Sequence, residues 1–377
     1  MSKLLPTLKN PHSKRVADLR GTVQLSADAV LAVSDLVQAL HGKIAKPLQI
    51  GPSGAIATFV YASVRGITRG VAKTANAVLA RIPAADSTAV ASADGVGEAN
   101  FRSSLLSIVN GVCGDHLADS GNPLALPMQL LGSIDSSAKS PGKYALFIHG
   151  LCLNESHWRV DAHVAALEQL GFTAIFLRYN SGLAIAENGA QLARLMEEKL
   201  HQPGVEVAVI AHSMGGLVMR SALSDAKRGK MRWPTRLSAL VFLGTPHAGA
   251  PLEQAGYWVD SIWQKIPYAK ALAPIAKLRS VGIQDLRHGK MDDDPKALHK
   301  LPRKLRCFAI AASLSADKNG LKQRLLGDGL VPVESALGVV ENQRLVPEQN
   351  TETLYGIGHL ELLYAPGVTA QLVRWLT

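Results

Sequence analysis

The sequence predicts an α/β protein in which a doubly wound, mostly parallel sheet follows a helical N-terminal extension. Before about residue 140, apolar residues recur at helical spacing, as from Val30 to Leu40 and from Ile56 to Val78. After it, short apolar runs alternate with longer amphipathic stretches, a pattern typical of parallel strands joined by crossover helices. We therefore divide the chain into a helical region, 1–140, and an α/β domain, 141–377.

Each strand of the predicted sheet is a short run between turn signals, and most are continuously apolar, as expected for strands covered on both faces. The strand candidates are Tyr144–His149, Ala174–Tyr179, Val207–Ala211, Ala239–Gly244, Cys307–Ala312 and Thr351–Tyr355. Helical patterns lie between them at Val160–Leu170, Ile185–Leu200 and Gly216–Lys227, and a further helix is expected at Phe101–Val112.

Composition and charge exclude several classes of protein. The 377 residues are 47% hydrophobic and 19% charged, which is a globular composition. The 3 cysteines are far apart and form no disulfide or zinc-binding pattern. The basic N-terminus lacks the apolar core of a secretory signal, so we expect a cytoplasmic protein. The net charge of +10 favours an anionic partner, but without interleaved aromatic and basic residues we expect no nucleic acid.

The segment from Val207 to Arg220 is the most informative one in the chain. An apolar strand runs through Ala211 and His212 into Ser213, and a helical pattern begins directly after it. A sharp strand-to-helix turn exposes the hydroxyl at its apex and needs small residues two positions before and after, here Ala211 and Gly215. The pattern therefore indicates that Ser213 is a nucleophile.

A serine hydroxyl requires a base, and the base requires an orienting carboxylate. When the nucleophile lies on such a turn, the carboxylate and then the histidine follow it along the chain. Asp328 lies in a Gly-flanked loop after the Cys307–Ala312 run, and His359 follows the last strand. Glu334 and Asp317 remain alternative carboxylates, whereas the other histidines precede Asp328 and are in the wrong order.

Attack on a carbonyl creates an oxyanion that needs hydrogen-bond donors already in place. One donor should be the backbone N–H of Met214, which follows the nucleophile. The second should come from the loop after the Tyr144–His149 strand, where Gly150 permits a close turn. Leu151 is the candidate for this second N–H, and an ordinary glycine at a strand end is the alternative.

Together these motifs resemble the lipases and esterases of the α/β-hydrolase superfamily over about residues 140–377. The run Gly244–Gly249, GTPHAG, is similar to a signature of the triacylglycerol lipase branch, which includes the glycosylphosphatidylinositol deacylase-like proteins. The resemblance implies hydrolysis of a lipophilic ester through an acyl-enzyme. It implies neither a metal nor an organic cofactor.

Further residues are candidates for contact with the substrate. A cap over the acyl pocket is expected at 250–305, where Trp258 and Trp263 belong to an aromatic-rich segment. The alternative, equally well supported, is that these aromatics are ordinary core residues of an inserted segment. His149 and His247 are tentative substrate-facing residues, with a structural role as the alternative.

The N-terminal extension carries a basic amphipathic pattern. Arg65, Arg69 and Lys73 fall on one stripe of the second predicted helix, with apolar residues opposite. Such a helix either packs on its own domain, which is the commoner outcome, or makes peripheral contact with a membrane.

The triad leaves three functions open. The leading hypothesis is a carboxylic-ester hydrolase of the lipase or esterase type. An acyltransferase would use the same triad, with an alcohol in place of water. A non-catalytic binding protein with the same fold is the third, because fold alone does not establish function. Thioester or polyester cleavage also remains open.

Overall fold

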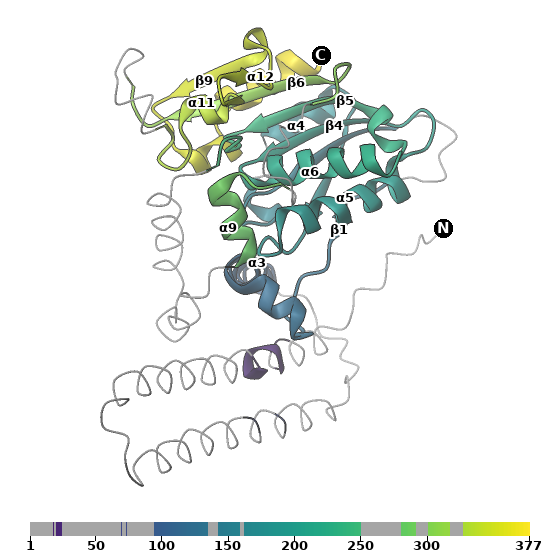
Figure 1. Cartoon of the computed structure of the whole chain (residues 1–377), viewed down its shortest axis with the longest axis vertical. Coiled ribbons are helices and arrows are strands. Elements are labelled where there is room, and N and C mark those ends of the chain that lie inside the picture. Colours follow the sequence, from purple (N-terminus) through teal and green to yellow (C-terminus); the bar gives the residue numbers. More distant parts are fainter. Residues whose placement is uncertain are drawn as a thin grey trace, which may run out of the picture. The chain divides into compact units, whose positions relative to one another are not determined.

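The computed structural model describes residues 18, 20–24, 69, 73, 94–134, 142–158, 162–249, 280–291, 301–316 and 327–377 (Figure 1). The chain divides into two compact units. The first comprises Met1–Val96, His116–Ala125 and Tyr268–Leu278, and the second comprises Gly97–Asp115, Leu126–Pro267 and Arg279–Thr377. The second unit contains the sheet and every described candidate site residue.

Only part of the first unit is described. The Asn122 side chain joins its own loop to the helical segment 20–24, since Nδ2 donates to the Gly21 carbonyl at 3.0 Å and Oδ1 accepts from the Leu124 N–H at 2.9 Å. Arg69 and Lys73 are helical and exposed. The predicted helix at Val30–Leu40, and the rest of the one at Ile56–Val78, lie outside the described residues. No helix in the described segments is long and apolar enough to span a membrane.

The second unit is built on a seven-stranded sheet in the order β1-β3-β2-β4-β5-β6-β9. All neighbours pair in parallel except β1 and β3. The strands are β1 Gln129–Leu131, β2 Lys143–Ile148, β3 Thr173–Arg178, β4 Glu206–His212, β5 Leu237–Leu243, β6 Arg306–Ser313 and β9 Thr351–Tyr355. A separate hairpin pairs β7 Val339–Val340 with β8 Gln343–Arg344. The doubly wound, mostly parallel sheet predicted from sequence is confirmed.

Helices cover both faces of this sheet (Figure 1). Helices α5 and α6 pack on the face that carries Tyr144, Leu146 and Ile148 of β2. Helices α4 and α12 pack on the face that carries Ala145 and Phe147. The helices are α3 Asp94–Asp119, α4 His163–Gln169, α5 Ile185–Leu200, α6 Met214–Arg228, α9 Val281–His288, α11 Val333–Ala336 and α12 Pro366–Leu376, with 3₁₀ turns at Glu155–Trp158, Trp233–Arg236, Glu348–Asn350 and His359–Leu363.

Helices α5 and α6 approach closely at a glycine, Gly189, which has no side chain between them. A Cβ on Gly189 of α5 would lie 2.2 Å from the Ser221 Oγ and 2.9 Å from the Ala222 backbone nitrogen of α6. Both distances are shorter than contacts that real Cβ atoms make. The absence of a side chain at Gly189 therefore brings α5 against α6, the helix that begins directly after Ser213.

One element of the second unit was not predicted from the sequence, and another was predicted with shorter bounds. Strand β1 lies before residue 141, where we expected the α/β domain to begin, and pairs with β3 at the sheet edge. Helix α3 extends beyond the predicted Phe101–Val112 and is kinked at Cys113, whose φ is −137° and ψ is 28°. Its residues Gly97–Asp115 belong to the same unit as the sheet.

Candidate active site

Ser213 lies at the apex of the predicted turn between β4 and α6. Its φ of 54° and ψ of −127° are rare for a residue with a side chain and cost about 1–3 kcal/mol. Ser213 N–H donates to the Leu243 carbonyl of β5 at 2.8 Å, which anchors the turn to the neighbouring strand. A Cβ on Gly215 would lie 2.6 Å from the His149 carbonyl oxygen, so the small residue predicted there is sterically required.

His359 and Asp328 form a buried hydrogen-bonded pair. His359 Nδ1 lies 2.7 Å from Asp328 Oδ2, and the exposed fractions of the two side chains are 4% and 0%. The other carboxylate oxygen, Asp328 Oδ1, accepts from the N–H groups of Leu330 at 3.0 Å and Val331 at 2.8 Å. The carboxylate is thereby fixed in the orientation that holds the imidazole. Of the two alternative carboxylates, Glu334 is exposed on α11 and Asp317 lies outside the described residues.

Several contacts place the His359 ring beside the turn that carries Ser213. Its ring centroid lies 4.7 Å from that of His212, the residue directly before the serine. A Cβ on Gly244, which follows β5 with a φ of 58°, would lie 3.1 Å from His359 Nδ1 and from Cε1. Gly150 abuts the serine itself, because a Cβ there would lie 2.9 Å from Ser213 Cβ. The structure thus gathers the three predicted triad residues at the carboxyl ends of the parallel strands.

In the loop after β2, the backbone N–H groups of Cys152 and Leu153 have acceptors, whereas that of Leu151 has none among the described residues. Cys152 adopts a φ of 59°, and its N–H donates to Ser181 Oγ at 3.0 Å. Leu153 N–H donates to the Gly150 carbonyl at 3.3 Å. Within the described segments, the Leu151 N–H donates to no acceptor. The bonds on the next two residues hold this free N–H in place.

Met214 offers the second free N–H. As the first residue of α6, it has no intrahelical acceptor, and no other described group accepts from it. The amino end of a helix also carries a partial positive charge. Both predicted oxyanion donors are therefore available at the same end of the sheet as Ser213.

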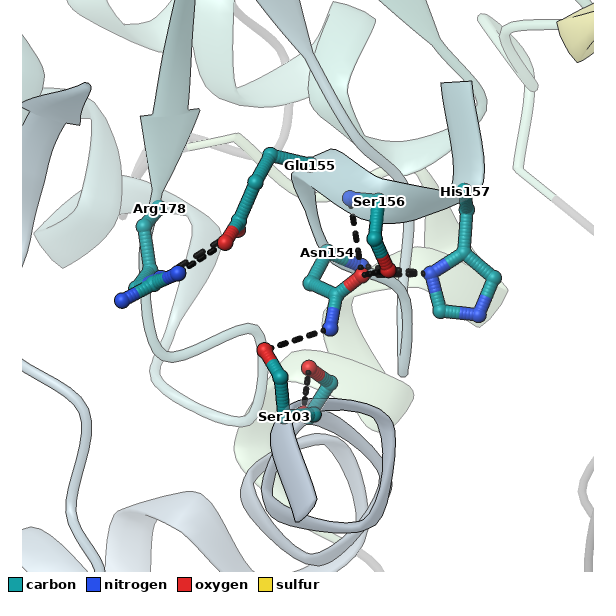
Figure 2. A network of polar contacts seen from close by, with 7 residues as sticks. Ser103, Asn154, Glu155, Ser156, His157 and Arg178 are labelled. Carbon is teal, nitrogen blue, oxygen red and sulfur yellow. Dashed lines mark hydrogen bonds and ion pairs between the residues drawn. The ribbon is translucent and has the colours of Figure 1, made fainter. Parts of the chain in front are cut away.

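A polar network holds the loop that follows Leu151 (Figure 2). The Asn154 carboxamide Nδ2 donates to Ser103 Oγ of α3 at 2.9 Å. The Arg178 guanidinium at the end of β3 pairs through both Nε and Nη2 with the Glu155 carboxylate. The loop is thus tied to a helix and to a strand by contacts that span long stretches of sequence, which sequence reasoning missed.

His149 lies in the core and makes protein contacts on several sides. Its ring stacks on Tyr179 with centroids 4.4 Å apart, and its Nδ1 lies 2.8 Å from the Gly150 carbonyl. The Tyr179 hydroxyl donates to the His149 carbonyl at 2.8 Å. Burial lowers the pKa of His149 to about 3, so the ring is neutral at physiological pH. These contacts favour the structural alternative over contact with substrate.

His247 of the GTPHAG segment is also buried. Its Nδ1 accepts from Arg220 Nη1 at 3.1 Å, and its ring meets Phe242 edge-on with centroids 4.6 Å apart. Burial, and then the positive charge of Arg220, lower its pKa well below 6.5. His247 thus joins the segment after β5 to α6. Trp258 and Trp263 lie outside the described residues.

In the described segments the cysteine thiols are buried, and no side-chain cluster has the arrangement of a metal site. Cys113, Cys152 and Cys307 are buried free thiols, and burial raises the pKa of Cys113 and of Cys307 to about 12. No cluster of three or more histidine, cysteine, aspartate or glutamate side chains there has the arrangement of a metal site.

Comparison with known proteins found one family model and several solved structures that resemble part of the chain. A family model described as a domain of unknown function, DUF7379, matches residues 122–279, and no curated protein matches the chain. The chain is similar to the mature lipase BlEst2 of Bacillus licheniformis, with 18% identity, a TM-score of 0.46 and coverage of 67% of this chain and 98% of that one.

Two further solved structures resemble the chain at a similar level. A thermophilic esterase of Thermogutta terrifontis is 15% identical, with a TM-score of 0.41 over 66% of this chain and 92% of that one. The metagenomic carboxyl esterase MGS0156 is 15% identical, with a TM-score of 0.41 over 63% and 75%. The sheet order, the crossover helices and the turn at Ser213 are those of the α/β-hydrolase fold.

The buried histidines predict a loss of stability in acid. The folded-state pKa of His149, about 3, lies below its ordinary value of 6.5, so burial of the neutral ring stabilises the fold above pH 6.5. That contribution is lost as the pH falls from 6.5 toward 3, by about 2 kcal/mol at pH 5. Between pH 7.5 and pH 5, the free energy of unfolding in urea should therefore fall less in His149→Phe than in the native chain. An equal fall in the two proteins would contradict the burial of His149 as a neutral ring.

Proposed function

We propose that the chain is a serine hydrolase that cleaves carboxylic esters through an acyl-enzyme. The observation that carries the proposal is the buried His359–Asp328 pair, with Nδ1 2.7 Å from Oδ2, beside a serine held at a strained turn. A carboxylate that accepts from Nδ1 leaves Nε2 unprotonated and able to remove a proton. The backbone strain is a second support, because such strain clusters at functional sites.

In the proposed mechanism, Ser213 Oγ attacks the ester carbonyl carbon while its proton passes to His359 Nε2. Asp328 stabilises the resulting imidazolium, and the N–H groups of Leu151 and Met214 donate to the oxyanion. Collapse of this intermediate expels the alcohol, which takes the proton from His359. Water then repeats the sequence on the acyl-enzyme and releases the acid, so the cycle needs neither a metal nor an organic cofactor.

The substrate class follows from the sequence resemblance rather than from the site geometry. We propose a lipophilic ester, and we retain membership of the GTPHAG-type lipase branch as part of the proposal. Contact with a membrane through the helix that carries Arg69 and Lys73 also remains a proposal, supported by their exposure.

The first test is hydrolysis of p-nitrophenyl esters from short to long acyl chains by the native protein and by Ser213→Ala. We expect native turnover and a loss of about 10³-fold or more in the variant, because removal of the nucleophile leaves only binding and the oxyanion donors. The chain-length optimum separates an esterase from a lipase. An added alcohol that is converted to ester faster than acid is released would indicate an acyltransferase. Two folded but equally inert proteins would contradict the proposal.

A second test separates Asp328 from Glu334, one of its two alternatives in the sequence. Asp328→Asn keeps the size of the side chain but reverses the preferred proton position on His359, and we expect kcat to fall by about 10⁴-fold. Glu334→Gln makes the same chemical change on the exposed surface of α11 and should leave kcat unchanged. Steady-state kinetics on the preferred ester compare the two variants. A larger loss of kcat in Glu334→Gln than in Asp328→Asn would contradict the assignment of the orienting role to Asp328.

A further inference from the structure

The side chain of His212 is buried at the end of β4, directly before Ser213, and its exposed fraction is 0%. Its Nε2 lies 3.1 Å from the backbone carbonyl oxygen of His359. The hydrogen-bonding atoms belong to residues 147 positions apart in the sequence. The residue that adjoins the nucleophile therefore contacts the residue proposed as the base.

The direction of this hydrogen bond fixes the state of the ring. A carbonyl oxygen only accepts, so His212 Nε2 must carry the proton. Burial, followed by the proximity of His359, lowers the pKa of His212 well below 6.5, which keeps the ring neutral. His212 Nδ1 has no partner among the described residues and faces Gly150, where a Cβ would lie 3.2 Å away. Within the described part of the chain, the ring therefore makes one hydrogen bond, to the His359 carbonyl.

The bonds that hold the backbone of His359 come from two directions. On one side, the His359 N–H donates to the Asp328 carbonyl at 3.2 Å. The preceding residue, Gly358, donates its N–H to Glu361 Oε2 at 2.6 Å. On the other side, the His359 carbonyl accepts from His212. Among the hydrogen bonds that His359 makes within the described segments, only the His212 bond reaches β4, the strand that directly precedes Ser213.

We propose that His212 is a positioning residue for the base: its bond to the His359 carbonyl ties the base loop to the nucleophile turn. The inference rests on the function proposed above, because it concerns the same serine and histidine. Since His212 is joined by a peptide bond to Ser213, this hydrogen bond links the backbone of the base directly to the backbone of the nucleophile. Without the His212 bond, the loop that carries His359 remains bound to Asp328 but is no longer hydrogen-bonded to the residue before the nucleophile.

The test compares two substitutions that differ in their ability to donate. His212→Leu keeps an apolar side chain of similar size but removes the N–H, and we expect kcat to fall by about 10- to 100-fold, since misplacement by about 1 Å costs up to that much. KM should change by less than about twofold, because His212 does not contact substrate in the proposal. His212→Gln places an amide N–H near the position of Nε2 and should restore kcat to within about fivefold of native.

Two further variants separate positioning from a general loss of stability. His212→Asn carries the same amide as glutamine on a shorter side chain that does not reach the His359 carbonyl, so it should resemble His212→Leu and replaces it if the leucine variant does not fold. Asn350→Leu is the matched control, because Asn350 Nδ2 donates to the Cys307 carbonyl at 3.1 Å near the amino end of β6. It removes a similar bond far from the carboxyl ends of the strands and should lower stability without lowering kcat.

A second readout does not depend on turnover. Hydrogen–deuterium exchange of the peptide that contains residues 357–364 should be faster in His212→Leu than in native protein and near native in His212→Gln. Equal kcat in native and His212→Leu proteins, or equal loss in the leucine and glutamine variants, overturns the proposal. If the native protein hydrolyses no ester, the function proposed above fails, and exchange then decides the role of His212. Unchanged exchange in His212→Leu overturns that role as well.

Discussion

The strained backbone at Ser213 is the constraint on which the site depends. With a φ of 54°, the turn reverses the chain so sharply that β4, α6 and the loop after β2 converge at one point. Convergence of this kind excludes side chains, and the contacts of Gly150 and Gly215 show where a Cβ would collide. The fold offsets the strain through the Ser213 hydrogen bond to β5 and through the burial of α6 against the sheet.

The parallel sheet then determines which residues meet. Because β2, β4, β6 and β9 run in the same direction, the loops after these strands open at one edge of the sheet, and each contributes one part of the candidate site. Buried neutral histidines reinforce this edge. His149 supports the loop that carries the free Leu151 N–H, His247 links the GTPHAG segment to α6, and His212 contacts His359. In the proposed mechanism, such packing keeps the oxyanion donors in place before substrate binds.

Local patterns predicted much of this arrangement, whereas contacts between distant residues were not predictable. Apolar runs located the strands, and Ile185–Leu200 was predicted with the bounds that the structure gives. The apex serine and its small neighbours identified the turn. Strand β1 was missed because its three residues carry too little pattern. The Glu155–Arg178 pair and the His212 contact join residues far apart, and residue type alone did not separate structural histidines from substrate-facing ones.

The measurement that tests the central claim most directly is mass-spectrometric mapping of the adduct formed with diisopropyl fluorophosphate. An ordinary serine does not react with this reagent, whereas a serine activated by a neighbouring base attacks its phosphorus. We predict a single adduct on Ser213 in the folded protein, and no adduct in His359→Ala. An unmodified folded protein, or an adduct on another serine that persists in His359→Ala, would contradict the account.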